Sequence, residues 1–317
     1  MMVGEKYYAA IDLGTNSCRM IIADSTGNYV YNQSAATRLG EGMSLNNCFT
    51  PEAVERGINA LKEFGELLHR SNCQYRAIAT AACRAASNGK EFVERVKKEC
   101  GVELEVIDGH EEARLNLIGA LANADKNKPY VIVYDIGGGS TEVTLAQTSD
   151  AKIIQTISIP WGARNASEKY GLNDYDEKKA TAFRSEILRY LEEFKTKCAY
   201  ERYKGKISFV ATSSTPLRLS SYIRRTKEYN REAEDGKTMT AEQINKALKE
   251  WYATTEAERA ASVYIGPKRA PIFVAGTILL KTINDELGVE ILTASYKSAK
   301  DSIIMELIRK DSDGTSD

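Results

Sequence analysis

The order of apolar and polar residues along the chain predicts strands followed by helices, twice over. In the first half, three apolar segments have the length and composition of strands. They lie at about 6–13, 19–24 and 28–37. Residues 51–71 then carry apolar side chains at every third or fourth position, which predicts a helix with one buried face. Thr50 and Pro51 suit the N-cap and the first position of this helix.

Short strands and helices then alternate up to a polar joint at 123–129. The elements expected before the joint are a strand at 76–80, a helix at 88–99, a strand at 103–107 and a helix at 111–122. Those expected after it are strands near 130–135, 141–147 and 152–159, a helix at 176–198, a strand at 207–211, several further helices, a strand at 289–292, a helix at 297–309 and a frayed polar tail at 311–317. Strands that alternate with helices predict α/β sheets with helices on both faces.

One short motif occurs twice, each time directly after an apolar strand. Asp12-Leu-Gly-Thr-Asn-Ser17 follows the first strand, and Asp135-Ile-Gly-Gly-Gly-Ser140 follows the strand that opens the second half. A repeat at this distance is typical of a duplicated domain. We therefore expect an N-terminal domain over 1–125 and a C-terminal domain over 126–317, whose last helix can pack back on the first domain.

The residue types of this motif favour phosphate. Glycine lets backbone N–H groups approach an anion, and a carboxylate at a strand end can hold a divalent cation. One such turn alone is more typical of an ordinary strand end, whereas two in the same frame could hold a phosphate chain between them. Seven residues after the acid the copies differ, because the first has Arg19 and the second has Glu142. This difference suits an anion in one half and a metal in the other, although two outward strand residues would give the same spacing.

Composition and charge restrict the class of protein. With 317 residues, 43% of them hydrophobic and 27% charged, the chain has the size of about two globular domains. No apolar run has the length of a membrane span, and the N-terminal residues lack a signal-peptide pattern, so we expect a cytoplasmic protein without a membrane partner. The net charge of −1 gives no general attraction to nucleic acid. The six scattered cysteines are expected to be reduced thiols, and two histidines are too few for a histidine metal cluster.

Two segments before the joint contain charged residues with more than one explanation. Glu111 and Glu112 lie in the first turn of an expected helix, where acidic residues are favourable, but a glutamate beside phosphate-binding turns could also take a proton from water. Arg84 follows a strand and could bind phosphate oxygens. The structural alternative for that turn is that Ser87 or Asn88 caps the next helix.

The second half also leaves alternatives open. Basic residues cluster at 195–206 and 218–231, where a solvated helical face and a track for a long anionic ligand are both possible. Small residues at 211–215 and 275–277 could border a nucleotide or phosphate, or could simply permit close packing. Capping boxes are expected at Thr240 and Thr255.

Taken together, these segments resemble the exopolyphosphatase / guanosine pentaphosphate phosphohydrolase family, within the superfamily of actin, sugar kinases and acetate kinase. The resemblance covers essentially the whole chain and rests on 10–19, 38–42, 79–84, 109–114, 135–142 and 269–277. Gly109-His-Glu-Glu-Ala-Arg114 and Asp135-Ile-Gly-Gly-Gly-Ser-Thr-Glu142, in that order, are its most specific parts. Two segments depart from the family pattern, namely Gly162-Ala-Arg-Asn165 in place of Gly-Ala-Val-Arg, and Ser298-Ala-Lys-Asp-Ser302 in place of Gly-Leu-Arg-Glu-Gly.

The resemblance implies two ribonuclease-H-like domains, a duplicated βββαβαβα unit, with an active-site cleft between them. It implies hydrolysis of a terminal phosphoanhydride with Mg²⁺ or another divalent cation. Glu112 would be the base that activates water, and Asp135 and Glu142 would hold the metal or place the water. The residues that would bind phosphate are Asp12, Gly14, Thr15, Asn16, Ser17, Arg19, Arg84, Gly137, Gly138, Gly139, Ser140 and Thr141.

The expected reaction is release of phosphate from the ends of inorganic polyphosphate. Hydrolysis of guanosine pentaphosphate is the alternative within the same class, and the sequence does not separate the two. An ATP-dependent kinase of the same superfamily is a more distant alternative, because the Glu-Glu-Ala-Arg segment favours water as the acceptor. A non-enzymatic nucleotide-binding or filament protein is also more distant, because the candidate base Glu112 is present. The expected partner is the substrate itself, while a homodimer, the preferred polymer length and the metal are left open.

Overall fold

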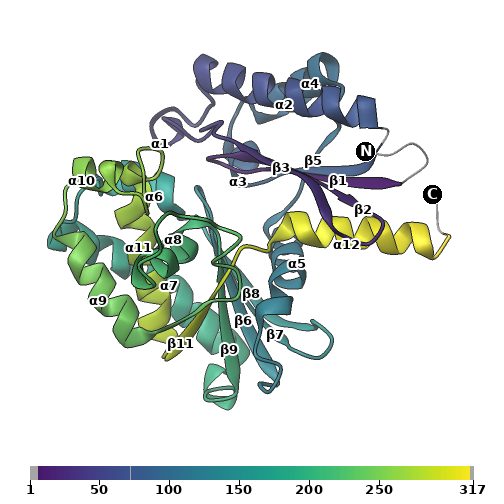
Figure 1. The fold of residues 1–317 in the computed structure, drawn as a ribbon. Helices are drawn as coiled ribbons and strands as arrows, with labels where there is room; N and C mark the ends of the chain where they lie inside the picture. Colours follow the sequence, from purple (N-terminus) through teal and green to yellow (C-terminus); the bar gives the residue numbers. More distant parts are fainter. Residues whose placement is uncertain (1–5, 72, 315–317) are drawn as a thin grey trace. The chain divides into compact units, whose positions relative to one another are not determined.

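The computed structural model describes residues 6–71 and 73–314, which form two compact units. Unit 1 contains the described residues up to Leu115 and those from Ala299 onward, and unit 2 contains Asn116–Ser298. Each unit contains one sheet with helices against it (Figure 1). In the described part of the chain, no helix combines the length and the apolar composition of a membrane span. The boundary expected after residue 125 stays a prediction about separately folding domains.

Unit 1 contains a five-stranded sheet in the order β3-β2-β1-β4-β5. Its strands are β1 (Tyr7–Leu13), β2 (Cys18–Asp24), β3 (Tyr29–Ala35), β4 (Gln74–Ala79) and β5 (Leu104–Val106). Its helices are α1 (Met43–Asn46), α2 (Pro51–Ser71), α3 (Ala81–Ala85), α4 (Gly89–Cys100), the first half of α5 (Gly109–Ala120) and α12 (Ala299–Ser312). β1 is antiparallel to β2 and parallel to β4, so the first three strands form a meander and the last two return through helices.

The alternation of side chains along β1 gives sheet 1 two buried faces. Ala9 and Ile11 pack on the side of α2 and α4. Tyr8 and Ala10 pack on the other side, against residues of α12 that include Ile303. The last helix of the chain therefore completes the core of the unit that contains the first strand.

Unit 2 contains a six-stranded sheet in the order β10-β11-β9-β6-β7-β8. Its strands are β6 (Tyr130–Ile136), β7 (Thr141–Gln147), β8 (Ile153–Ile159), β9 (Ile207–Thr212), β10 (Thr238–Thr240) and β11 (Ile291–Ser295). Its α-helices after α5 are α6 (Ala163–Tyr170), α7 (Glu177–Cys198), α8 (Ser214–Ile223), α9 (Ala241–Tyr252), α10 (Glu256–Ala261) and α11 (Ala270–Leu287). Without the short β10, the strand order repeats that of unit 1, which confirms the expected α/β class with a duplicated fold.

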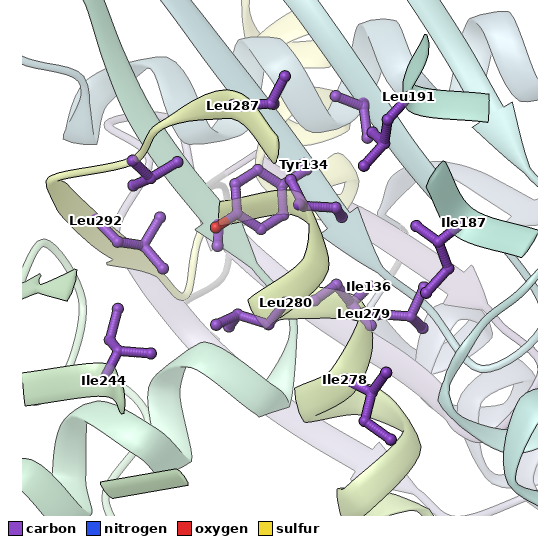
Figure 2. Packing of buried hydrophobic residues seen from close by; sticks show 14 of the residues in the cluster. Tyr134, Ile136, Ile187, Leu191, Ile244, Ile278, Leu279, Leu280, Leu287 and Leu292 are labelled. Carbon is purple, nitrogen blue, oxygen red and sulfur yellow. The ribbon is translucent and has the colours of Figure 1, made fainter. Parts of the chain in front are cut away.

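Sheet 2 is also buried on both faces. On one face Tyr134 lies among leucine and isoleucine side chains of α7 and α11 (Figure 2). The Tyr134 hydroxyl donates to Asn284 Oδ1 at 2.5 Å. On the other face Val131 and Val133 pack against Leu117 of α5. The residues of β6 that precede and follow Tyr134 therefore point toward α5, and Asp135 shares this face by alternation.

Several sequence expectations hold and three are wrong. The capping boxes at Thr240 and Thr255 are present. The last strand lies at Ile291–Ser295, later than the expected 289–292. Three α-helices, α1, α3 and α6, and the short strand β10 were not expected at all. The tail is not frayed at its start, because α12 continues to Ser312 and the Asp311 carboxylate accepts from Lys6 at 2.7 Å and from Tyr8 at 2.8 Å. Residues 315–317 lie outside the described part.

Candidate active site

Two carboxylates face each other at the end of sheet 2. Asp135 of β6 is directly opposite Glu142 of β7 in the antiparallel register, so their side chains lie on the same face. Glu142 is only 2% exposed, which excludes the outward strand residue left open by the spacing. Like charges directly opposite each other destabilise a strand pair. A pair of this kind in a buried position is therefore favourable only when something neutralises it, such as a cation.

Neighbouring side chains orient both carboxylates. Asp135 Oδ2 accepts from Asn116 Nδ2 at 3.2 Å, and Asp135 Oδ1 accepts from Thr212 Oγ1 at 2.5 Å. Glu142 Oε1 accepts from Ser158 Oγ at 2.8 Å. Metal-binding carboxylates are commonly fixed by such hydrogen bonds, and carboxylate oxygens suit hard divalent cations such as Mg²⁺. The donor set of Asp135 and Glu142 therefore fits the expected cofactor.

The glycine-rich turn of unit 2 is fixed from one side by α6. Gly137 N donates to Ser140 O at 3.0 Å and closes the turn. The first amides of α6 then bind its carbonyls, because Ala163 N donates to Gly137 O at 2.9 Å and Arg164 N to Gly138 O at 2.9 Å. The next helix thus uses its own N-terminal donors to hold the turn.

The fixed carbonyls determine where the amides of this turn point. In a trans peptide the N–H lies opposite the C=O of the preceding residue. Since the carbonyls of Gly137, Gly138 and Gly139 all point toward the α6 side, the N–H groups of Gly138, Gly139 and Ser140 point away from it. Successive amides that point to one side bind anions. This geometry is consistent with the predicted phosphate-binding role of the turn.

Close packing behind the turn requires glycine at position 162. A Cβ atom there would lie 2.4 Å from Gly138 C and 2.5 Å from Gly139 N. Both are backbone atoms that cannot move without moving the turn. Gly162 keeps the first glycine of the family segment Gly-Ala-Val-Arg, and its role here is to let α6 approach.

The turn of unit 1 has the same closing bond but a different support. Gly14 N donates to Ser17 O at 3.0 Å. Its carbonyls are held by a loop, because Gly40 N donates to Thr15 O at 2.9 Å and Arg38 N to Asn16 O at 3.1 Å. By the same peptide geometry the N–H groups of Asn16 and Ser17 point away from that loop. The segments 10–19 and 38–42 of the family resemblance therefore meet in one structure.

The charges beside the unit 1 turn differ from those of unit 2. Asp12 is directly opposite Arg19 in the register of β1 and β2. The two residues lie on the sheet face that packs against α12, since their neighbours Ala10 and Ile21 do. Opposite charges on paired strands stabilise each other. The sequence difference seven residues after the acid thus places an acid–base pair in unit 1 and a pair of acids in unit 2.

The two glutamates at the start of α5 have separate environments. Glu111 binds Arg114 at 2.7 Å and Arg76 at 2.9 Å. Its hydrogen bond with Arg114, more than that with Arg76, holds the pKa of Glu111 below its usual value against the opposing effect of burial. The structural explanation for acidic residues in this turn therefore applies to Glu111, whose charge is used to fix α5 within unit 1.

Glu112 is buried on another side of the same helix. It is 8% exposed, and its Oε2 accepts from Arg84 Nη1 at 2.9 Å. Arg84 Nη1 also donates to Ile107 O at 2.7 Å, so the guanidinium is anchored at the end of sheet 1. Arg84 therefore forms an ion pair with Glu112, the candidate base. Contact of Arg84 with phosphate stays a prediction. Asn88 does not cap α4 through its side chain, which instead binds both backbone groups of Phe49.

The remaining predicted site residues lie in or beside the two turns. Thr15 and Ser140 are each 6% exposed. Thr141 is fully buried and its hydroxyl donates to Trp161 O at 2.8 Å, so its side chain supports the segment that leads to α6. Contact of these residues with phosphate stays a prediction.

Three further polar residues of the site were not identified from the sequence: Asn116, Ser158 and Asn165. Asn116 had one signal, because it follows Glu112 by four residues and such residues share a helix face. Ser158 could be found only from the register of β7 and β8, where it is opposite Glu142. Thr212 belongs to the small-residue segment 211–215, whose nearness to phosphate was one of two alternatives.

The basic segment 218–231 is used within unit 2. The Arg218 guanidinium lies 4.1 Å from the centre of the Tyr229 ring and donates to Tyr264 O. Arg224 binds the buried Glu234 at 3.1 Å. These contacts hold the loop after α8 against the unit and give the arginines a structural role that neither sequence alternative included. At 275–277, close packing applies, because a Cβ on Gly276 would lie 2.8 Å from Thr215 Oγ1.

Comparison with known proteins defines the class of this chain. A model of the Ppx/GppA phosphatase family matches residues 21–311, and the chain belongs to this family. Exopolyphosphatase 2 of Mycobacterium tuberculosis is 28% identical, over 94% of this chain and 98% of that protein. A bifunctional 3-dehydroquinate synthase/phosphatase of Fusobacterium nucleatum is 29% identical over 94% of this chain, which spans only 46% of that protein.

Solved structures agree with the fold. An exopolyphosphatase from Cytophaga hutchinsonii has a TM-score of 0.87 at 23% identity, with 98% of this chain and 99% of that chain covered. A Ppx/GppA family member from Aquifex aeolicus has a TM-score of 0.77 at 24% identity, with 99% and 100% covered. These likenesses confirm the expected fold class of two ribonuclease-H-like α/β domains.

Proposed function

We propose that this phosphatase-family protein hydrolyses terminal phosphoanhydride bonds, and that its substrate is inorganic polyphosphate. The observation that carries the proposal is the pairing of two elements in unit 2, namely three amides aimed to one side and two opposed carboxylates at the same end of the sheet. Backbone amides bind the phosphate oxygens themselves and need no nucleotide base on the substrate. Carboxylates hold the cation that phosphoryl transfer needs. The 28% identity with a protein named exopolyphosphatase supports the choice of polymer.

Helix α5 supports a role for Glu112 together with the acidic pair. The helix is continuous from Gly109 to Ala120, and Glu112 and Asn116 are four residues apart on it. Asn116 donates to Asp135. We therefore propose that the Glu112 carboxylate acts as the base beside the cation that Asp135 and Glu142 would hold.

In this mechanism the protein positions the terminal phosphate and the attacking water, and it holds the charges that stabilise the phosphate. The amides of the unit 2 turn hold the terminal phosphate. Glu112 accepts a proton from the water that attacks this phosphate, the bond to the bridging oxygen breaks, and the shortened polyphosphate leaves, while Arg84 keeps the Glu112 carboxylate in place. A divalent cation bound by Asp135 and Glu142 would neutralise charge on the phosphate oxygens. Phosphoryl transfer depends mostly on such positioning and charge stabilisation, so no covalent step on the protein is required.

The test compares substrates side by side. Purified protein is incubated with long-chain polyphosphate, with guanosine pentaphosphate, and with ATP plus a sugar or acetate, each over a range of Mg²⁺ concentrations and in excess chelator. We expect Mg²⁺-dependent release of phosphate from polyphosphate. Release from guanosine pentaphosphate alone would change the substrate, transfer from ATP would replace hydrolysis by a kinase reaction, and full activity in chelator would remove the metal.

A further inference from the structure

The side chain of Asn165 spans the glycine-rich turn of unit 2. Its Nδ2 donates to Gly139 O at 2.9 Å and to Pro160 O at 3.0 Å. Its Oδ1 accepts from Gly162 N at 2.8 Å. One side chain thus joins the turn, the end of the strand segment before α6 and the N-cap of α6 itself.

The neighbours of Asn165 determine the orientation of its amide group. The two backbone atoms near Nδ2 are carbonyl oxygens, which only accept, and the backbone atom near Oδ1 is an N–H, which only donates. The reverse orientation would oppose oxygen to oxygen and N–H to N–H. The site therefore requires a side chain with both a donor and an acceptor at this distance.

We propose that Asn165 is a positioning residue for substrate phosphate, which it controls through the Gly139–Ser140 peptide. The carbonyl of Gly139 and the N–H of Ser140 belong to one planar group and point in opposite directions. When Asn165 holds the carbonyl, the N–H of Ser140 is fixed on the side where phosphate is expected. This inference rests on the proposed function for the identity of the substrate, but phosphate binding tests it without turnover.

The three peptides of the turn differ in what holds them. The carbonyls of Gly137 and Gly138 are held by backbone amides of α6, which no side-chain substitution at 165 removes. The carbonyl of Gly139 is held by the Asn165 side chain. A substitution at 165 should therefore release one of the three phosphate donors and leave the other two, and α6, in place.

The experiment uses Asn165→Asp and Asn165→Ala in the full chain. Aspartate has the shape of asparagine and keeps the acceptor for Gly162 N–H, but it loses both donors. Alanine loses the contacts without adding a charge. Asn245→Asp is the matched control, because Asn245 lies on the exposed face of α9 and uses its oxygen to accept from Lys281 at 2.9 Å, which aspartate retains.

The measurements are the affinity for inorganic phosphate by calorimetry, kcat and KM with polyphosphate, and the melting temperature. We expect both Asn165 variants to lose on the order of 10-fold in phosphate affinity and in kcat/KM, less than deletion of an oxyanion donor costs in an enzyme. Their melting temperatures should stay within a few degrees of the wild type, and Asn245→Asp should behave as the wild type.

Three outcomes would overturn the inference. They are unchanged phosphate affinity in both variants, a loss in Asn165→Asp alone, which would show repulsion by the new charge, and a loss that accompanies general unfolding. If the wild type hydrolyses none of the substrates but the variants still lose phosphate affinity, the proposed function fails and the positioning role stands.

Discussion

The turn of unit 1 and the turn of unit 2 close with the same hydrogen bond of 3.0 Å, from glycine N–H to serine carbonyl, but they are supported differently. Behind Gly14–Ser17 lies a loop that contains Arg38, a non-glycine residue with a φ of 49°. Behind Gly137–Ser140 lies the N-terminus of α6, with Asn165 as a side-chain support. The two repeats therefore share the turn but differ in the segment that supports it.

The charges follow the same division. In unit 1 the acid of the motif is paired across the strands with Arg19, and in unit 2 with Glu142. Opposite charges satisfy each other without a ligand, whereas two acids require a cation or a proton. In the proposed function, the unit 1 repeat would bind an anion beside a basic residue, and the unit 2 repeat would hold a cation beside an anion.

The largest expected effect concerns Glu112, the proposed general base. Glu112→Gln keeps size and hydrogen bonding but cannot take a proton, so kcat should fall by about 10²–10⁴-fold. The check is the rate of phosphate release at saturating polyphosphate, with binding measured separately. Glu111→Gln is the control, because Glu111 binds Arg114 and Arg76 instead. A folded Glu112→Gln variant with a normal rate would remove this residue from the mechanism.

A second test asks whether the cation belongs to unit 2. Asp135→Asn should raise the Mg²⁺ concentration that gives half-maximal activity by more than the roughly 10–100-fold typical for loss of an outer partner of a metal ligand. Asp12→Asn, the same change at the equivalent position of unit 1, should leave that concentration unchanged. Activity is measured across a Mg²⁺ titration for both variants. Equal shifts would mean that the two acids share the metal and that the proposed division is wrong.

A third test compares the two turns at equivalent glycines. A Cβ on Gly137 would lie 2.9 Å from Ser140 O, whereas one on Gly14 would lie 3.6 Å from Ser17 O, an ordinary contact. Gly137→Ala should therefore lower the free energy of unfolding of unit 2 by about 1–3 kcal/mol, as overpacking does. Gly14→Ala should cost less than that. Chemical denaturation with a probe in each unit gives both values, and a larger cost at Gly14 would contradict the comparison.

The smallest expected effect concerns pH and unit 1. Lys6, followed by Tyr8, holds the pKa of Asp311 below its usual value. A depressed pKa means that the stabilisation is complete above the pKa of the unfolded chain, about 3.9, and is lost as pH falls through the lower folded value. Asp311→Asn should therefore be slightly less stable than the wild type at pH 7 and equal to it at the acid end. Thermal melts from pH 7 downward test this, and a difference that grows toward acid would contradict it.

The sequence alone was sufficient to predict most of the strands along the chain and to single out both residues of the acidic pair. Asp135 and Glu142 were found because each lies in a local motif, whereas their position opposite each other follows from the antiparallel register of β6 and β7. Asn165 and Ser158 could not be found in this way, since their roles depend on hydrogen bonds between segments that only the folded chain brings together. Helix α6 was missed because its eight residues are too few for a clear apolar period.

Because the last helix, α12, belongs to unit 1, unit 2 can be completed before unit 1 during synthesis. Unit 2 is continuous from Asn116 to Ser298, so all of its residues leave the ribosome before α12 does. Unit 1 is begun first, but the face of its sheet with Tyr8 and Ile21 is covered completely only when Ile303 joins Leu115 on it. A nascent chain that stops after unit 2 would therefore present a finished second unit and an unfinished first one, with an apolar face available to chaperones.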